Sequence, residues 1–581
     1  MSSLIPSSRL FNLISSLRPR FESSIKQRSP IINSVSTRPM AANLANGRPE
    51  VDYSLYLVTD SDLVPIGRTL EEQVAAALAG GTTIVQLREK TADTSTFVAL
   101  AKRLLKLTRA AGVPLLINDR VDVALAADAD GVHVGQSDLD AASVRRLIGP
   151  NKLVGLSIGT PAEAQAVCAL PEGTVDYVGI GTVYDTATKR TAKALLGLQG
   201  VRTVMGVLAS RPEIKAVSIG SMNLKTARNT VYKTQFRDDQ GQIVSIHGVA
   251  VVSALIAASD PAAAARELLA AVRTTPAWAL PATRTLSIAN DVFAPEAVVG
   301  LVRRSTPLVH CIINRVAANF AANIAIAAGA SPVMSENEGE FVDLARAASS
   351  PAGGALLINL GFPTEDFINS TYLPAVLAYN QQQRPIVLDP IAAGATALRK
   401  RAVATLLNHG HFAVIKGNEG EIFAVAGEPS AMRGVDSTSA LPLTERARVA
   451  LKLAQREKTI VCMTGAVDVV SDGTRVVIGR NGHPYLADIT ASGCVLGTLV
   501  AAFVGVLSPE KQIPERVIDN VLAALCLYNI AAERAAALPS VSGPGTFVPA
   551  LLDQIYALSK QSLDGNDSWF SDAKYELFRM P

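Results

Sequence analysis

Cysteine is scarce in this chain of 581 residues, and its placement excludes several kinds of site. The five cysteines are odd in number, widely scattered and never arranged as Cys-x-x-Cys. Disulfide scaffolds and structural zinc sites need paired, regularly spaced cysteines. We therefore expect a reducing compartment, the cytoplasm, and no structural zinc.

Long apolar runs and an excess of charge are also missing. The longest apolar run, residues 495–507, is shorter than the roughly 18 residues that a membrane-spanning helix needs. The net charge is only +3 and no long basic block occurs. Neither a membrane nor a nucleic acid is therefore expected as a partner.

The chain does have the length and composition of a multidomain α/β protein. Its 581 residues exceed the size at which a single core stops growing. Its 49% hydrophobic and 18% charged residues are ordinary for such a fold. Residues 1–48 differ because they are rich in serine and basic residues. They are expected to be a disordered or targeting segment, and the location is mitochondrial if the part before Met40 is a presequence.

From residue 49 to 272, short apolar runs alternate with Ala- and Leu-rich helical windows. Eight runs are expected to be strands: Leu55–Thr59, Thr83–Leu87, Val113–Asn118, Gly131–Val134, Leu153–Leu156, Val175–Ile180, Ile214–Ile219 and Val249–Val252. Eight strand–helix units in about 220 residues predict a (β/α)8 TIM barrel, whose chemistry lies at the carboxyl ends of its strands.

The residues at the end of the second run suit a diphosphate. Residues 84–90 are expected to form one strand, in which Gln86, Arg88 and Lys90 share a face because side chains alternate. An amide, a guanidinium fork and an ammonium in one row favour an anionic ligand. The alternative is an edge strand with a solvated, charged tip.

Two aspartates follow the third and fourth runs. Asp119 and Asp138 are hard oxygen ligands at the same predicted rim, and Mg²⁺ usually takes one or two carboxylates together with substrate phosphates. With Arg88, Lys90 and Lys189 at the same rim, they predict a diphosphate–Mg²⁺ site. Asp138 could instead cap the helix that follows it.

A second anion site is expected near the last strands of the barrel. The hydroxyls of Thr186 and Thr188 and the backbone N–H groups near Gly220 and Ser253 suit a monophosphate.

Four ordered motifs make this half of the chain recognisable. Gln86-Leu87-Arg88-Glu89-Lys90, Ile117-Asn118-Asp119-Arg120, residues 130–136 (DGVHVGQ) and Thr186-Ala187-Thr188-Lys189 resemble thiamine phosphate synthase over roughly residues 51–272. The resemblance implies that aminomethylpyrimidine diphosphate is bound by Gln86, Leu87, Arg88, Glu89, Lys90, Asn118, Ser157 and Lys189. It also implies Mg²⁺ ligands at Asp119 and Asp138, and a thiazole phosphate site at Thr186, Thr188, Gly220, Val252 and Ser253.

One position departs from that family. Where the family usually has Ile-Gly-Gly-Ile, this chain has Ile219-Gly220-Ser221-Met222. The backbone freedom of the second glycine is lost at one edge of the thiazole phosphate site.

A linker at residues 273–286, with two prolines and no periodicity, precedes a second domain at residues 287–560. The strongest signal there is Ala491-Ser492-Gly493-Cys494, directly before an apolar helical run. Small residues opening a helix leave free N–H groups aimed at an anion. Cys494, in the first turn, is expected to have a lowered thiol pKa and to accept a proton from a substrate hydroxyl. The alternative is a small buried cysteine.

Polar residues again follow short β-like runs in this half. Asp389, Lys416, Glu421 and Thr464 come just past such runs, where open α/β sheets bind ligands. No GxxxxGK[ST] motif occurs, so a nucleotide is expected to bind in another way.

The second half resembles hydroxyethylthiazole kinase of the ribokinase-like fold. The match runs through His310-Cys311-Ile312, residues 319–323 (NFAAN), Ser331-Pro332-Val333-Met334, Asp389-Pro390, Lys416-Gly417-Asn418 and residues 491–494 (ASGC). The resemblance implies ATP as a substrate and Cys494 as the proton acceptor. It puts Met334 and Ala491 at the thiazole, Lys416 and Thr464 at ATP, and Asp389 and Glu421 near Mg²⁺. His310 and the polar tail at residues 561–581 receive no function.

Together the two halves resemble the fungal bifunctional enzymes of thiamine biosynthesis. The resemblance implies phosphorylation of 4-methyl-5-(2-hydroxyethyl)thiazole, then condensation with 4-amino-2-methyl-5-(diphosphooxymethyl)pyrimidine to give thiamine phosphate and diphosphate. Related kinases are trimers, so a homo-oligomer, a trimer or a dimer of trimers, is expected by analogy. Two alternatives remain: a thiamine-phosphate-binding regulator with an inactive barrel, and a thiazole tautomerase barrel fused to the kinase.

Overall fold

The computed structural model describes residues 50–185, 195–238, 240–275, 295–429, 441–506 and 517–580, together with two short strands at 432–433 and 436–437. The targeting segment expected at residues 1–48 lies outside the described residues, as does most of the linker expected at 273–286. Among the helices described, none has the length and apolar character needed to cross a membrane.

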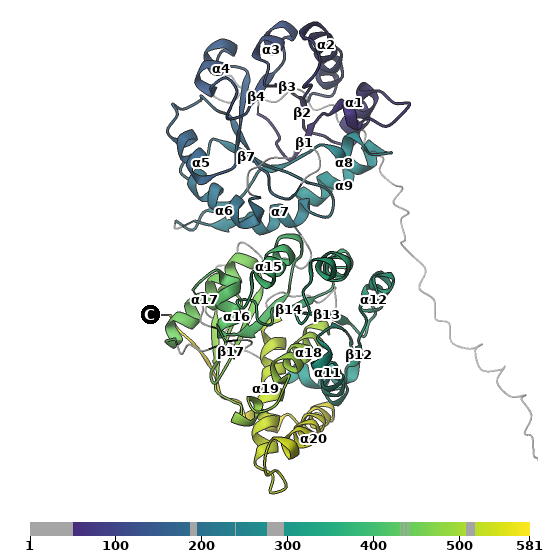
Figure 1. Cartoon of the computed structure of the whole chain (residues 1–581), viewed down its shortest axis with the longest axis vertical. Coiled ribbons are helices and arrows are strands. Elements are labelled where there is room, and N and C mark those ends of the chain that lie inside the picture. The colour runs from purple at the N-terminus through teal and green to yellow at the C-terminus, as the bar shows by residue number, and fades with distance from the viewer. Residues whose placement is uncertain are drawn as a thin grey trace, which may run out of the picture. The chain divides into compact units, whose positions relative to one another are not determined.

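The first domain is a closed barrel of eight parallel strands, as the alternation of apolar runs predicts (Figure 1). Around the barrel the strands follow the order β1-β10-β7-β6-β5-β4-β3-β2. Their bounds are β1 Leu55–Val58, β2 Ile84–Leu87, β3 Leu115–Asn118, β4 Gly131–Val134, β5 Leu153–Ile158, β6 Tyr177–Ile180, β7 Lys215–Ile219 and β10 Gly248–Val251. A short hairpin, β8 Phe236–Arg237 and β9 Ile243–Val244, precedes β10.

Helices connect these strands and cover the outside of the barrel (Figure 1). They are α1 Leu70–Ala79, α2 Thr94–Ala110, α3 Val121–Ala127, α4 Ala141–Ile148, α5 Pro161–Cys168, α6 Gly197–Leu208, α7 Ala227–Thr234, α8 Ser253–Ile256 and α9 Pro261–Arg273. Side chains alternate along each strand, so Leu55 and Leu57 join the core under the helices, whereas Tyr56 and Val58 join the smaller core inside the barrel.

The second domain is built on a nine-stranded sheet with the order β12-β11-β13-β14-β15-β18-β19-β20-β21. The first six strands pair in parallel, and the last three are joined antiparallel. The bounds are β11 Leu308–Ile312, β12 Ser331–Val333, β13 Gly354–Asn359, β14 Ile386–Asp389, β15 Val414–Asn418, β18 Ile460–Thr464, β19 Asp468–Ser471, β20 Val476–Gly479 and β21 Tyr575–Leu577. Strands β16 Met432–Arg433 and β17 Asp436–Ser437 form a separate pair.

Both faces of this sheet are covered by helices. One face carries α10 Glu296–Ser305, α11 Arg315–Ala328, α18 Ser492–Gly505, α19 Val517–Ala536 and α20 Pro544–Leu563. The other carries α12 Phe341–Ala347, α14 Leu373–Gln381, α15 Ala397–His409, α16 Glu419–Ala426 and α17 Leu443–Glu457. Alternate residues of β13 therefore enter different cores, Leu357 on the first face and Leu356 on the second.

The residues expected to be a polar tail belong to this domain. Helix α20 runs past position 560 to Leu563, and β21 then pairs antiparallel with β20 at the edge of the sheet. Between them Trp569 is 1% exposed, and its indole N–H donates a hydrogen bond to Ser562 Oγ. The segment after position 560 is thus not a tail but the last part of the kinase-like fold.

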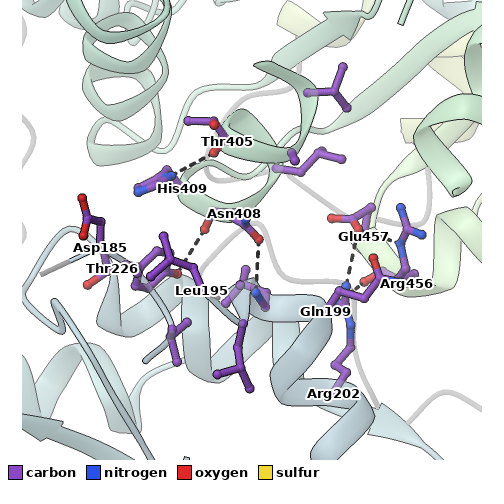
Figure 2. Close-up of a pocket in the computed structure, with 18 of the residues that line it drawn as sticks. Asp185, Leu195, Gln199, Arg202, Thr226, Thr405, Asn408, His409, Arg456 and Glu457 are labelled. Carbon is purple, nitrogen blue, oxygen red and sulfur yellow. Dashed lines mark hydrogen bonds and ion pairs between the residues drawn. The ribbon is translucent and has the colours of Figure 1, made fainter. Parts of the chain in front are cut away.

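The two domains meet along α6 and α7 of the barrel and the ends of α15 and α17 of the second domain. Lys233 of α7 forms an ion pair with Glu457 of α17, and Tyr184 donates a hydrogen bond to the backbone oxygen of Asn408 in α15. Beside these contacts is a cavity of about 780 Å³ lined by both domains (Figure 2).

Candidate active sites

The strand expected at residues 84–90 is shorter than predicted. Strand β2 ends at Leu87, where its pairing with β3 ends at Ile117, so Arg88 and Lys90 lie on the following loop. The prediction that Gln86, Arg88 and Lys90 share a strand face is therefore wrong. Leu87 is fully buried among the residues packed under the helices.

The loop after β2 is held by the loop after β1. Arg88 N donates to Thr59 Oγ1 (2.9 Å), and the Arg88 guanidinium lies 3.5 Å from Asp60 Oδ2. Ser61 donates a hydrogen bond to the Glu89 carboxylate, and burial is the main cause that raises the pKa of Glu89.

Asp119 and Asp138 come together at the rim of the barrel, as the sequence predicts. Burial raises the pKa of Asp119 to about 6, and the neighbouring Asp138 carboxyl adds to that effect, whereas Asn118 and the Lys90 ammonium oppose it. Two facing carboxylates, one of them Asp119 with its raised pKa, are an arrangement that a divalent cation stabilises. Among the described residues no group of three or more His, Cys, Asp or Glu is gathered for a metal, but Mg²⁺ needs only one or two carboxylates plus phosphate oxygens.

The interior of the barrel contains a chain of buried hydrogen bonds that the sequence reading missed. Gln86 Nε2 donates to Tyr56 OH (2.7 Å), Tyr56 OH lies 2.6 Å from Tyr177 OH, and Tyr177 OH lies 2.8 Å from His133 Nδ1. His133 Nε2 is 2.9 Å from Ser157 Oγ. This chain connects two of the predicted pyrimidine-site residues, Gln86 and Ser157, and fixes their orientation.

The loop after β7 forms the edge where the chain departs from its relatives. Gly220 has φ +114°, and a Cβ there would lie 2.6 Å from Thr182 Cγ2 and 2.8 Å from Val183 N, so only glycine fits. Ser221 adopts φ +49°, a region that favours glycine, and its hydroxyl donates a hydrogen bond to Asp185 O. Ser221 therefore keeps the backbone conformation expected of the missing glycine.

The structure describes only some of the other residues predicted to bind the thiazole phosphate. Val252 precedes the four-residue helix α8, which starts at Ser253 directly after β10. Thr186, Thr188 and Lys189 lie outside the described residues.

In the second domain the helix expected after Ala491 begins as predicted. Ala491 has φ +66° and ψ 7°, and α18 starts at Ser492, which puts Cys494 in its first turn. The Cys494 sulfur accepts hydrogen bonds from Asn359 Nδ2 (3.3 Å) and Asn314 Nδ2 (3.4 Å).

The expected lowering of the Cys494 pKa is wrong. Burial, followed by the negative charge of Asp389, raises the pKa of the thiol to about 11, although Lys416 and the two amides oppose the shift. The sequence shows the helix start but not the burial of the sulfur, and burial dominates.

The polar residues after the parallel strands form one buried network beside Cys494. Asn359 Nδ2 also donates to Asp389 Oδ2 (2.9 Å), and Lys416 Nζ lies 3.6 Å from Asp389 Oδ1 and donates to Gly493 O (2.8 Å). Burial raises the pKa of Glu421 to about 7, and Asp389 adds to the shift while Lys416 opposes it. Glu421 is held by the backbone N–H groups of Ala392 and Asn418.

Two other residues that were predicted to contact substrates, Thr464 and Met334, lie at the ends of other strands of the sheet. Thr464, at the end of β18, donates to Gly417 O (3.4 Å). Met334 directly follows the edge strand β12 and is 38% exposed. His310, which received no role, is fully buried with Nε2 2.9 Å from Ser335 O.

Asn314 and Asn359 are site residues that the sequence reading missed. Asn359 is the last residue of β13, so the rule that polar residues at strand ends approach the ligand could have found it. Asn314 caps α11 through its oxygen, which accepts from Ala317 N, and so resembles an ordinary helix cap in sequence.

Comparison with known proteins matches both halves. The Thiamine monophosphate synthase family matches residues 55–255, and the Hydroxyethylthiazole kinase family matches residues 299–561. A Schizosaccharomyces pombe protein described as a probable thiamine biosynthetic bifunctional enzyme is 39% identical over 91% of this chain and 99% of its own length. The thiamine biosynthetic bifunctional enzyme of Saccharomyces cerevisiae is 37% identical over 88% of this chain and 96% of its own.

Among solved structures, the hydroxyethylthiazole kinase protein of Pyrococcus horikoshii is 34% identical, with a TM-score of 0.40, over 49% of this chain and 99% of its own. The full-length relatives cover both domains in one polypeptide. The chain therefore belongs to the family of thiamine biosynthetic bifunctional enzymes, in which a thiamine phosphate synthase barrel is joined to a hydroxyethylthiazole kinase domain.

Proposed function

We propose that the kinase domain phosphorylates the hydroxyethyl group of the thiazole with ATP, and that the barrel joins the thiazole phosphate to the pyrimidine diphosphate. The product is thiamine phosphate, and diphosphate leaves. The observation that carries the proposal is that each domain gathers a charged site at the carboxyl ends of its parallel strands. In the barrel these residues are Asp119, Asp138 and Lys90, and in the kinase Asp389, Lys416 and Glu421.

In the barrel, Asp119 and Asp138 would hold Mg²⁺, while Lys90 and Arg88 would bind the diphosphate. When bound, Mg²⁺ neutralises the diphosphate and so makes it a better leaving group. The bond between the pyrimidine methylene carbon and the diphosphate oxygen breaks, and the thiazole nitrogen forms the new bond to that carbon. Gln86 and Ser157, fixed by the buried chain through Tyr56, Tyr177 and His133, would orient the pyrimidine.

In the kinase, the start of α18 would receive the charge of the transferred phosphoryl group. Ala491 precedes the helix in the left-handed conformation, and the N–H groups of its first turn have no acceptor within the helix. Cys494 would meet the substrate hydroxyl, and its thiolate form would accept the hydroxyl proton as the oxygen attacks the terminal phosphorus of ATP and the bond to the ADP oxygen breaks. Lys416 and Thr464 would contact ATP, and Asp389 and Glu421 would hold Mg²⁺, which is consistent with their raised carboxyl pKa values.

A homo-oligomer is part of the proposal. Helix α11 exposes Val316 (67%) and Ile326 (59%), and Met334 nearby in sequence is 38% exposed. Such exposed apolar side chains suit an interface with another copy of the chain. In that assembly Met334 would approach the thiazole of a neighbouring kinase site.

A reconstitution assay tests the proposed function and its alternatives. Purified chain is incubated with hydroxyethylthiazole, ATP, Mg²⁺ and the pyrimidine diphosphate, and each component is omitted in turn. Thiamine phosphate should form only in the complete mixture, and thiazole phosphate should restore it when ATP is omitted. A regulator would bind thiamine phosphate without forming it, and a tautomerase would convert the thiazole without pyrimidine diphosphate or Mg²⁺.

A further inference from the structure

Asn408, near the end of α15 in the kinase domain, is inserted between elements of the barrel. Its backbone oxygen accepts hydrogen bonds from Tyr184 OH and from Asn229 Nδ2, both at 3.1 Å. Its side-chain Oδ1 accepts a third from Leu198 N, also at 3.1 Å. Figure 2 shows Asn408 above the barrel helices, with dashed lines running from it to the barrel.

The third of these bonds caps a barrel helix from outside the barrel. Helix α6 begins at Gly197 after Leu196, whose side chain has no oxygen that could accept from the first turn. N–H groups in a first helical turn lack partners within the helix, and asparagine is among the best side chains for accepting from the second or third of them. Asn408 Oδ1 accepts from the second, Leu198 N, and so does what an N-cap side chain normally does.

The barrel leaves room for this asparagine. Gly197 has φ +59°, and a Cβ at that position would lie 2.9 Å from Asn408 Nδ2 and 3.0 Å from its Oδ1. A larger residue at position 197 would collide with the capping amide.

The start of α6 is hydrogen-bonded to Thr182 and Val183. These two residues also contact the loop that is proposed to bind the thiazole phosphate. Leu196 N donates to Thr182 O, Gly197 N donates to Val183 O, and Val183 N donates to Ile219 O at the end of β7. Gly220 packs directly on Thr182 and Val183, and Ser221 donates to the backbone oxygen of Asp185. Residues 182–185 therefore touch the proposed phosphate loop on one side and the helix capped by Asn408 on the other.

We propose that Asn408 of the kinase domain is a positioning residue for the synthase reaction, because it caps α6 and so fixes the loop that holds the thiazole phosphate. The inference rests on the proposed function of the barrel. Asn408 lies eleven residues after the start of α15, so it is roughly 16 Å along the helix from the end that follows Asp389 and β14 in the chain. The kinase reaction should not depend on its side chain.

The test uses the full chain and three variants: Asn408→Ala, Asn408→Asp and Thr405→Ala. Asn408→Ala removes the cap and keeps the backbone oxygen that Tyr184 and Asn229 use. Asn408→Asp restores a capping oxygen. Thr405 lies on the same helix and lines the same cavity but holds His409 through its backbone oxygen, so Thr405→Ala is the matched control.

Asn408→Ala should raise the synthase KM for thiazole phosphate about 3- to 30-fold, the equivalent of losing a helix cap. Asn408→Asp and Thr405→Ala should stay within about twofold of the unchanged chain, by the same conversion. The kcat and KM of thiazole phosphorylation should be unchanged in all three. A merely structural defect would lower synthase kcat or kinase activity and would not be rescued by aspartate.

The idea is overturned if Asn408→Ala leaves the KM for thiazole phosphate unchanged, if Asn408→Asp loses as much as Asn408→Ala, or if kinase activity falls in parallel. If Asn408→Ala does not fold, Asn408→Ser, with a shorter acceptor, gives the same comparison. Failure of the proposed function is separable, because the unchanged chain would then make no thiamine phosphate at all.

Discussion

Lys233 Nζ in the barrel lies 2.6 Å from Glu457 Oε2 in the kinase domain, and both side chains are almost fully buried (1% and 6% exposed). Lys233 also donates to Leu407 O, and Arg202 approaches the same carboxylate at 3.5 Å. Burial alone would raise the pKa of Glu457, but Lys233, Arg202 and Arg456 outweigh it and lower the pKa to about 2. The carboxylate is thus the anion around which the domain interface is assembled.

Replacing this carboxylate should destabilise the docked pair of domains. Glu457→Gln leaves Lys233 buried without its counter-charge, and breaking a buried pair in this way typically costs about 3–5 kcal/mol. We expect a lower midpoint in urea unfolding. Glu365→Gln is the control, because its pair with Arg401 is more than 60% exposed on both sides and exposed pairs contribute about 0–1 kcal/mol. Equal midpoints for the two variants would contradict a structural role for Glu457.

The same carboxylate predicts an acid dependence of stability. The pKa of Glu457 is about 2 in the folded chain, against a reference value of 4.5. Because the folded pKa is depressed, its contribution is present above pH 4.5 and is lost as pH falls from about 4.5 to about 2, at most by about 3 kcal/mol. Other carboxylates titrate in the same range. The measurement is therefore the difference in unfolding free energy between the unchanged chain and Glu457→Gln, which should shrink over that interval and be flat from pH 5 to 7.

Removing one rim carboxylate should stop coupling and spare the kinase. Asp119 has φ +62°, so Asp119→Asn, which tolerates that conformation, tests the charge without straining the backbone. Synthase kcat/KM should fall by at least about 100-fold, with a higher Mg²⁺ requirement, because a metal site of this kind contributes several kcal/mol. Lys90→Ala should act in the same direction.

The control for these variants is Asp122→Asn. Asp122 lies in the first turn of α3, and its side chain, 58% exposed, pairs with Arg120. It should leave synthase activity unchanged. Loss of thiazole phosphorylation in Asp119→Asn or Lys90→Ala would contradict two separate active sites.

Several structural features on which these experiments depend could not be predicted from the sequence alone. The alternation of apolar runs predicts all eight barrel strands, and β4 has the predicted bounds. The apolar run Thr83–Leu87 ends where β2 ends, but the longer strand expected at residues 84–90 does not form, since the pairing of β2 with β3 stops at Leu87. The three-residue strand β21 carries too little pattern to be recognised, and only its pairing with β20 makes it a strand.

The sequence predicted which polar side chains lie close together better than it predicted their pKa values. Motif spacing brought Asp119 and Asp138 together correctly, because strand ends share one rim. It could not show the buried chain from Tyr56 through Tyr177 to His133, since three different strands contribute to it. The same limit applies to Asn408, whose role depends on contacts between residues about 210 positions apart.

Ser221 should matter through its hydroxyl more than through its strained backbone. Ser221→Ala keeps the positive φ and removes the hydrogen bond to Asp185 O, so the KM for thiazole phosphate should rise about 2- to 12-fold. Ser221→Gly also loses the bond, but it relieves strain of about 1 kcal/mol and should stay within about threefold of the unchanged chain. Equal KM values for serine and alanine would show that the hydroxyl contributes nothing.

Cys494 is tested by the order of kinase rates among three side chains at one position. With its pKa raised to about 11, the thiol is protonated at pH 7, so only its minor thiolate form can accept the substrate proton, and kcat should rise as pH rises from 7 towards that value. Cys494→Ser should slow phosphorylation because a serine hydroxyl ionises far less readily than a thiol and so supplies less of the proton-accepting anion. Cys494→Asp should retain or raise the rate, measured as kcat with saturating ATP. Cys526→Ser, at a fully buried cysteine of α19, controls for a polar substitution in the core.

The size of the effect separates the sulfur from the backbone turn. General-base assistance is typically worth about 100- to 10,000-fold, and preorganised N–H donors can supply about 100- to 1,000-fold by themselves. If the proton acceptor limits the rate, kcat follows the order aspartate at or above cysteine, and cysteine above serine. If all three are equal, the N–H groups after Ala491 carry the catalysis, and Cys494 only fills the space between Asn314 and Asn359.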